Sequence, residues 1–193
     1  MNSRIKAMIK KIGKILLIII LGFLVFITGK FLLVWKSVEV DHSLSQKPIF
    51  KAFNKQKQAT IWSQEGEDAK TNDFKITSDS TSFEFYSCYI NRNPTLNITF
   101  SVGDGFSGGG YQIDILQNRY KVSPYSYTDN IKPFDFQNTG EYYKVLDSKL
   151  ILNQESYQKG DSMFGYTELK IQEGYGLGKH IVEAKGYFKG KVN

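Results

Sequence analysis

The pattern of hydrophobic and polar residues divides the chain into two parts. Residues 15–35 read ILLIIILGFLVFITGKFLLVW, an apolar run in which Lys30 is the only charged residue. At about 1.5 Å per residue, a helix of this length crosses the roughly 30 Å hydrocarbon layer of a membrane. We therefore predict a transmembrane helix, an uncleaved signal anchor, over residues 15–35. The residues that represent this membrane anchor are Ile15, Leu21, Phe26 and Trp35.

From residue 59 onward, apolar and polar residues alternate with a period of two. In LNITFSV, residues 96–102, Leu96, Ile98 and Phe100 fall on one side of an extended chain, and HIVEAKGYFKGKV, residues 180–192, alternates in the same way. Such strands bury one face and expose the other, which is typical of antiparallel sheets. The further strand candidates are ATIW, DFKIT, SFEFYSCYI, YQIDIL, RYKVSPYSY, EYYKVL, KLILNQ and YTELKIQ. About eight to ten short strands, with no convincing helix after the anchor, predict an all-β fold, either an antiparallel β-sandwich or a small barrel.

These patterns set the expected boundaries. Residues 1–14 form a basic tail, residues 15–35 the membrane helix, residues 36–58 a juxtamembrane tether, and residues 59–193 the β-domain. Within the tether, Pro48 can start a short helix that places Ile49, Phe50 and Phe53 on one face. This helix would lie on the membrane surface or pack against the β-domain, and the sequence leaves both options open.

The charge distribution supports this division and indicates an orientation. The formal net charge is +6, but seven of the 25 basic residues and none of the 19 acidic residues lie in the first 36 positions. The remaining chain is nearly neutral, so the basic balance does not indicate nucleic-acid binding. Because cations cluster before the apolar run, we expect the N-terminus in the cytoplasm and the β-domain outside, in a single-pass plasma (inner) membrane protein. The alternative is secretion after signal cleavage, although the small-residue cleavage pattern is poor.

A glycine-rich stretch, SVGDGFSGGG at residues 101–110, contains the letters G-x-G-x-x-G. A nucleotide site of this type needs a helix after the glycines, whereas strand-like alternation follows here. We therefore expect no nucleotide and no other cofactor. The expected role is a hairpin connection whose glycines adopt positive φ angles.

Candidate catalytic groups are few. Cys88 could pair with His180 as a nucleophile and base, and Glu84 could pair with Asp114 as the carboxylates of a hydrolase. Cys88 lies in a strand-like stretch and is expected to be a buried small hydrophobe. Two histidines, one of them in the tether, do not suffice for a typical zinc site, and no metal is expected.

Aromatic residues are the remaining candidates for a binding surface. Tyrosines are dense around a long polar connection, and the glycine stretch carries one large apolar residue. The candidate contact residues are Phe106, Tyr125, Tyr127, Tyr142 and Tyr143. We expect a non-catalytic interaction module of a bacterial cell envelope, which binds the lipid bilayer through its helix and another envelope protein or a glycan through its β-domain. A barrel that binds a small ligand in an apolar pocket of several hundred Å³ is the alternative, and a hydrolase is a third option.

Overall fold

The computed structural model divides the chain into two compact units, Met1–Lys36 and Ser37–Asn193. It describes residues 3–58, 68–77, 82–85, 87–92, 95–104, 106–128, 142–174 and 176–193. The predicted strand ATIW, at residues 59–62, lies outside the described residues.

The first unit is one helix, α1 (Ser3–Val34). Its segment Lys10–Val34 is long and apolar enough to cross a membrane, and none of it is buried within the protein. At about 1.5 Å per residue these 25 residues extend over about 38 Å. Near its C-terminal end the rings of Phe31 and Trp35 stack with centroids 5.4 Å apart. The predicted N-terminal helix is therefore confirmed in length and composition, and it begins before residue 15.

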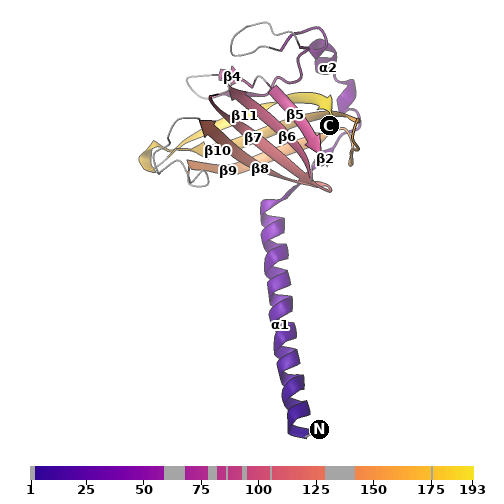
Figure 1. Cartoon of the computed structure of the whole chain (residues 1–193). Helices are drawn as coiled ribbons and strands as arrows, with labels where there is room; N and C mark the ends of the chain where they lie inside the picture. The colour runs from indigo at the N-terminus through magenta and orange to yellow at the C-terminus, as the bar shows by residue number, and fades with distance from the viewer. Residues whose placement is uncertain are drawn as a thin grey trace. The chain divides into compact units, whose positions relative to one another are not determined.

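The second unit consists of two β-sheets (Figure 1). The first sheet has the order β1-β8-β7-β6-β5 and the second has the order β2-β9-β10-β11-β3-β4. The strands of the first sheet are β1 (Lys36–Ser37), β5 (Ser87–Arg92), β6 (Leu96–Gly103), β7 (Ser107–Leu116) and β8 (Arg119–Thr128). Those of the second are β2 (Glu39–Val40), β3 (Lys75–Thr77), β4 (Ser82–Glu84), β9 (Tyr143–Leu152), β10 (Ser162–Glu173) and β11 (His180–Lys191). The pairings of β5 through β8 and of β9 through β11 are antiparallel, and β2 is parallel to β9.

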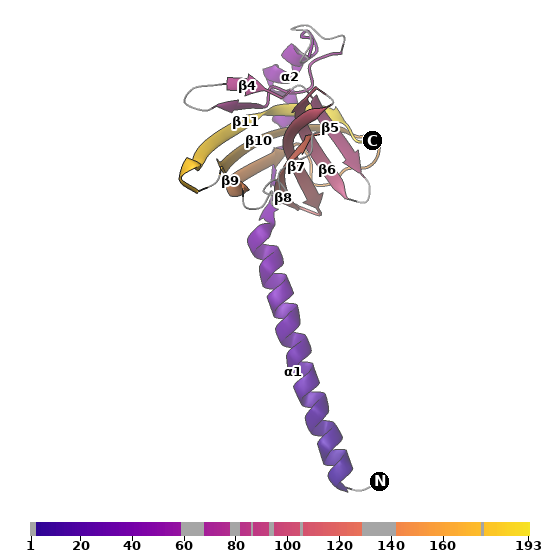
Figure 2. The ribbon, with the colours of Figure 1, turned by 60° about the vertical axis from the view of Figure 1, so that its left-hand side comes forward.

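The two sheets pack face to face around an aromatic core, and their strands cross at an angle (Figures 1 and 2). Phe100 of β6 in the first sheet stacks on Phe74, which precedes β3, with ring centroids 4.2 Å apart. It also meets Phe188 of β11 at 5.4 Å. All three side chains are fully buried. The all-β prediction is thus confirmed, and of the two architectures the structure has the sandwich, because the two sheets do not close into one barrel.

The sequence pattern misplaced two strand boundaries. The stretch SFEFYSCYI is not one strand: β4 belongs to the second sheet and β5 to the first. The chain crosses between the sheets at Phe85, whose buried ring joins the core and whose amide donates to the carbonyl of Phe74 at 2.9 Å. Conversely, the predicted strands EYYKVL and KLILNQ belong to the single strand β9. The register in which β9 pairs with β10 shifts between Lys170 and Ile171 of β10. A bulge of this kind allows alternation to shift without ending the strand.

The segment after α1 packs on the outer side of the second sheet. It contains the 3₁₀ turn η1 (Leu44–Gln46) and the short helix α2 (Pro48–Phe53). Phe50 and Phe53 are buried, and the ring of Phe50 meets those of Phe164 at 5.0 Å and Tyr187 at 5.8 Å. Of the two placements expected for this helix, the structure shows packing against the β-domain.

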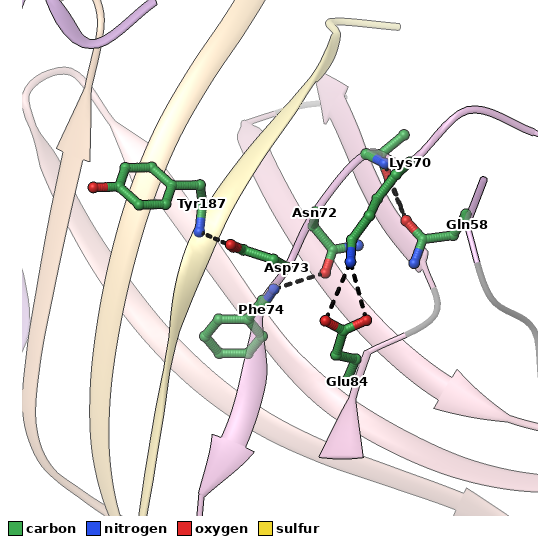
Figure 3. A network of polar contacts seen from close by, with 8 residues as sticks. Gln58, Lys70, Asn72, Asp73, Phe74, Glu84 and Tyr187 are labelled. Atoms are coloured by element: carbon green, nitrogen blue, oxygen red, sulfur yellow. Dashed lines mark hydrogen bonds and ion pairs between the residues drawn. The ribbon is translucent and has the colours of Figure 1, made fainter. Parts of the chain in front are cut away.

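A polar network fixes the chain before β3 to its neighbours (Figure 3). The carboxylate of Asp73 accepts from the amide of Tyr187 on β11 at 2.5 Å, and Lys70 donates to both carboxylate oxygens of Glu84 at 3.2 Å. Burial raises the pKa of Asp73. The side chain of Asn72 is fully buried and accepts from the amide of Phe74 at 3.0 Å. These bonds hold the entry to β3, which buries Phe74 at the centre of the sandwich.

Candidate ligand pocket between the sheets

A cavity of about 410 Å³ lies between the two sheets at one end of the sandwich. Several of its lining residues are at strand ends: Val102 near the end of β6, Glu173 at the end of β10, His180 at the start of β11 and Tyr143 at the start of β9. The other lining residues are Ile76, Phe85, Gly108, Gly109, Gly110, Tyr111, Tyr125, Ser126 and Val182. The wall is therefore mainly apolar and aromatic, with few polar groups, as is typical of small-molecule sites.

The glycine stretch explains why this end of the sandwich is hollow. Along β7 the inward positions are Gly109, Tyr111, Ile113 and Ile115, and the last three are buried. Because successive inward side chains fill a sandwich core, the missing side chain at Gly109 leaves space between the sheets. A Cβ at Gly109 would lie 2.7 Å from the carbonyl oxygen of Tyr125 on β8, so the close approach of the β8 backbone favours glycine at this position.

From the sequence, these glycines are expected to adopt positive φ angles in a hairpin connection. This expectation about φ is wrong for the glycines that the structure describes. Gly103, Gly108, Gly109 and Gly110 have no positive φ angle and lie within β6 and β7. They are needed because neighbouring atoms approach closely. The connection between these strands is instead tightened by Asp104, whose carboxylate accepts from the amides of Phe106 at 2.9 Å and Ser107 at 2.7 Å.

One carboxylate, that of Glu173, enters the apolar pocket. Cross-strand register places Glu173 between Tyr143 and His180 on the neighbouring strands of the second sheet. From the first sheet, the hydroxyl of Tyr111 donates to Glu173 Oε1 at 3.2 Å, while His180 Nε2 lies 3.9 Å from Oε2. The Glu173 side chain is 17% exposed, whereas that of His180 is 56% exposed and lies at the rim.

The pocket changes the acid–base behaviour of these groups. Burial raises the pKa of Glu173, and the hydrogen bond from Tyr111 and the neighbouring His180 oppose this effect. Burial and the nearby carboxylate raise the pKa of Tyr111, so its phenol stays protonated and acts as a donor. When Glu173 is ionised, it is a hydrogen-bond acceptor and an anion surrounded by aromatic rings. A ligand with a cationic or hydrogen-bond-donating group on an apolar body suits this arrangement.

Of the five aromatic residues proposed from the sequence as contact residues, only some border the pocket. Tyr143 lines the pocket, and the ring of Tyr142 meets that of Tyr143 at 4.6 Å. Tyr125 also borders the pocket, but its side chain is on the outward face of β8, opposite Gly110. Phe106 lies on the turn before β7 and Tyr127 on β8, and neither lines the pocket.

Sequence reasoning missed Glu173 and Tyr111. A signal for Glu173 was present, because it continues the inward series of Thr167, Leu169 and Ile171 along β10. A carboxylate at an inward position is unusual unless it has a partner or a function.

The proposed catalytic carboxylates are on different sheets and have separate partners. Glu84 on β4 pairs with Lys70, as Figure 3 shows. Asp114 on β7 accepts from the side-chain amide of Gln112 at 2.7 Å. Neither residue lines the pocket between the sheets.

The proposed thiol–imidazole pair is also divided between the sheets. Cys88 lies on β5 of the first sheet and packs against the core, but it is partly buried rather than fully buried as expected; His180 begins β11 of the second sheet. Burial raises the pKa of the Cys88 thiol, which opposes formation of a reactive thiolate. Within the described part of the chain, no three His, Cys, Asp or Glu side chains come together around a potential metal position.

The fold and the pocket define a class of protein: a β-sandwich that follows a helix of membrane-spanning length and holds an aromatic-lined cavity with one carboxylate. Comparison of the chain with models of protein families, with curated proteins and with solved structures finds no match.

Proposed function

We propose that this protein is a membrane-anchored binding domain that holds a small ligand in the pocket between its sheets. The ligand has an apolar, ring-sized body and a cationic or hydrogen-bond-donating group. The observation that carries the proposal is the placement of Glu173, a mostly buried carboxylate, in an otherwise apolar cavity of about 410 Å³. Burying a carboxylate costs free energy unless a partner compensates for it, and a bound cation would add to the hydrogen bond from Tyr111.

Of the three functions left open by the sequence, ligand binding accounts best for the pocket. In each catalytic pair that was considered, the two residues lie on different sheets, and of these four residues only His180 lines the cavity. An interaction module would not require a cavity between its sheets. The ligand domain would be displayed on the outer side of a bacterial plasma membrane, with the basic N-terminus in the cytoplasm.

The orientation is tested separately from ligand binding. Protease added to intact spheroplasts should digest the β-domain and leave a short membrane-bound fragment. Complete protection of the domain until the membrane is lysed would contradict this orientation.

The pocket is tested with three probes that share one ring: phenethylamine, 2-phenylethanol and phenylacetate. The chain has two histidines, so full-length protein labelled with ¹⁵N-histidine in detergent gives a simple spectrum. His180 lies at the pocket rim, whereas His42 bonds to the carbonyl of Asn153 elsewhere. We expect phenethylamine to shift the His180 signals at the lowest concentration and phenylacetate at the highest, while those of His42 stay unchanged.

The variant Glu173→Gln tests whether the Glu173 carboxylate binds the cationic group of the ligand. It should weaken phenethylamine binding by about tenfold or more, because it removes a charge-assisted hydrogen bond. Its matched control is Glu168→Gln on the same strand, since Glu168 is exposed and bonds to Tyr166 outside the pocket. The proposal fails if no probe shifts His180, or if Glu173→Gln leaves the order of the three probes unchanged.

A further inference from the structure

The outward face of the first sheet differs in composition from the outward face of the second. On the second sheet this face carries ion pairs, such as Lys149 with Glu39 at 3.1 Å and Lys170 with Glu183 at 3.2 Å. On the first sheet, charged strand residues gather near the β7–β8 turn, where Asp114 lies opposite Lys121. Towards the glycine-rich end, the described outward strand residues are hydroxyl, amide, glycine and tyrosine residues, and none of them is charged.

Glycines on this face make tyrosine rings lie flat on the sheet. Tyr127 on β8 is opposite Gly108, which is opposite Gly103 on β6. A Cβ at Gly108 would lie 2.6 Å from the Tyr127 hydroxyl oxygen, so the tyrosine side chain covers the space of the absent side chains. One row further, Tyr125 is opposite Gly110, and its hydroxyl reaches the carbonyl of Phe100 on β6 at 3.5 Å. Both side chains therefore extend across β7 on the outward face of the first sheet.

Two further exposed aromatic side chains lie near these tyrosines. Tyr89 on β5 is 56% exposed, and Phe106 on the turn before β7 is 70% exposed. Three strand spacings of about 4.8 Å separate β5 from β8, so the tyrosines extend over about 14 Å. Between them, the hydroxyls of Ser87 and Ser101 bond to each other at 2.6 Å. We name this surface, formed by Tyr89, Ser101, Gln112, Tyr125 and Tyr127, the tyrosine face.

We propose that the tyrosine face binds a neutral polysaccharide. The apolar faces of sugar rings pack on aromatic rings, and their hydroxyl groups bond to the hydroxyl and amide groups between these rings. The absence of charge among these strand residues favours an uncharged polymer over an anionic one. Within the second unit the face is accessible, because η1 and α2 cover the other sheet and none of the helices and strands described for this unit lies over this one (Figure 1).

The proposal is tested by native gel electrophoresis of the full-length protein in lipid nanodiscs. The gels contain laminarin, galactomannan, soluble xylan or a chitin-derived oligosaccharide mixture as neutral probes, and alginate as the anionic probe. We expect at least one neutral probe to retard the protein and alginate not to do so. Tyr89→Ala and Tyr127→Ala should each weaken the retardation by about tenfold, whereas Tyr127→Phe should keep most of it, because the ring is retained.

Two controls separate this proposal from its alternatives. Ile181→Ala removes an apolar side chain of similar exposure, 51%, from the second sheet and should have no effect. Glu173→Gln should also have no effect, so that failure of the pocket and failure of the tyrosine face are distinguishable. The proposal is overturned if no neutral probe retards the protein, or if the tyrosine variants are retarded as strongly as the wild type. It is also overturned if Tyr89→Ala only converts a dimer to a monomer, because the face would then join two copies of the chain.

Discussion

Replacing Phe50 by alanine tests whether the segment after the membrane helix is a tether or a part of the folded domain. The Phe50 side chain is 3% exposed and its ring meets those of Phe53, Phe164 and Tyr187 at 5.9, 5.0 and 5.8 Å. In a tether, this substitution would have almost no effect on stability. In the observed packing, it removes the ring that joins α2 to the second sheet.

The size of the effect follows from this burial. Truncation of a buried phenylalanine to alanine costs about 3–5 kcal/mol in a domain core. Phe50 lies in a small cluster with Leu44 and Phe53 on the outer side of the second sheet, where neighbours can close part of the cavity, so we expect the lower limit, about 3 kcal/mol. For a domain of this size, 1 kcal/mol shifts the unfolding midpoint by about 2–4 °C, which gives a decrease of about 6–12 °C.

The assay is thermal unfolding of the full-length protein in detergent, followed by near-ultraviolet circular dichroism of the tyrosines. Phe106→Ala is the matched control, because it makes the same chemical change at a side chain that is 70% exposed. Its midpoint should shift by no more than about 2 °C. If Phe50→Ala and Phe106→Ala have the same midpoint as the wild type, the packing of α2 against the domain is refuted.

Three further predictions concern the core and the pocket. Gly165→Ala should destabilise the domain by about 1–3 kcal/mol, because the added Cβ would lie 2.6 Å from a ring carbon of the buried Phe188; an unchanged unfolding midpoint would contradict this. Cys88 should react with a thiol reagent at pH 8 much faster in denaturant than in the native protein, because burial raises its pKa; equal rates would show that the thiol is accessible. The affinity for phenethylamine should fall as the pH falls through the raised pKa of Glu173, which lies above the ordinary 4.5, because protonation removes the anion. In Glu173→Gln the affinity should not change in this pH window, and a remaining decrease would assign the titration to another group.

The fold class could be predicted from the sequence because alternation reports burial directly. The inward series on β11, which includes Val182, Ala184 and Phe188, is buried in the structure as the pattern requires. Alternation does not report which sheet a strand joins. The stretch that contains β4 and β5 keeps its apolar and aromatic character while the chain passes from one sheet to the other at Phe85. Only packing between the sheets distinguishes the two strands.

The pocket could not be predicted in the same way, because it depends on pairs of residues that are distant in sequence. Tyr111 and Glu173 meet from opposite sheets, 62 positions apart. The proposed tyrosine face likewise depends on register, since Tyr125 and Tyr127 lie flat only because Gly110 and Gly108 are their cross-strand partners. The tyrosines and the glycines were both visible in the sequence, but their pairing was not.

One short strand segment therefore shapes both of the proposed sites. Side chains alternate along a strand, so Gly109 faces the interior while Gly108 and Gly110 face outward. The first leaves space for the pocket, and the other two allow tyrosine rings to cover the outer surface. A nucleotide-binding loop would have used the same residue type for a different reason, namely close approach of the backbone to phosphate. In this protein the glycines are explained by what lies on either side of the sheet, and their letters alone do not identify a ligand.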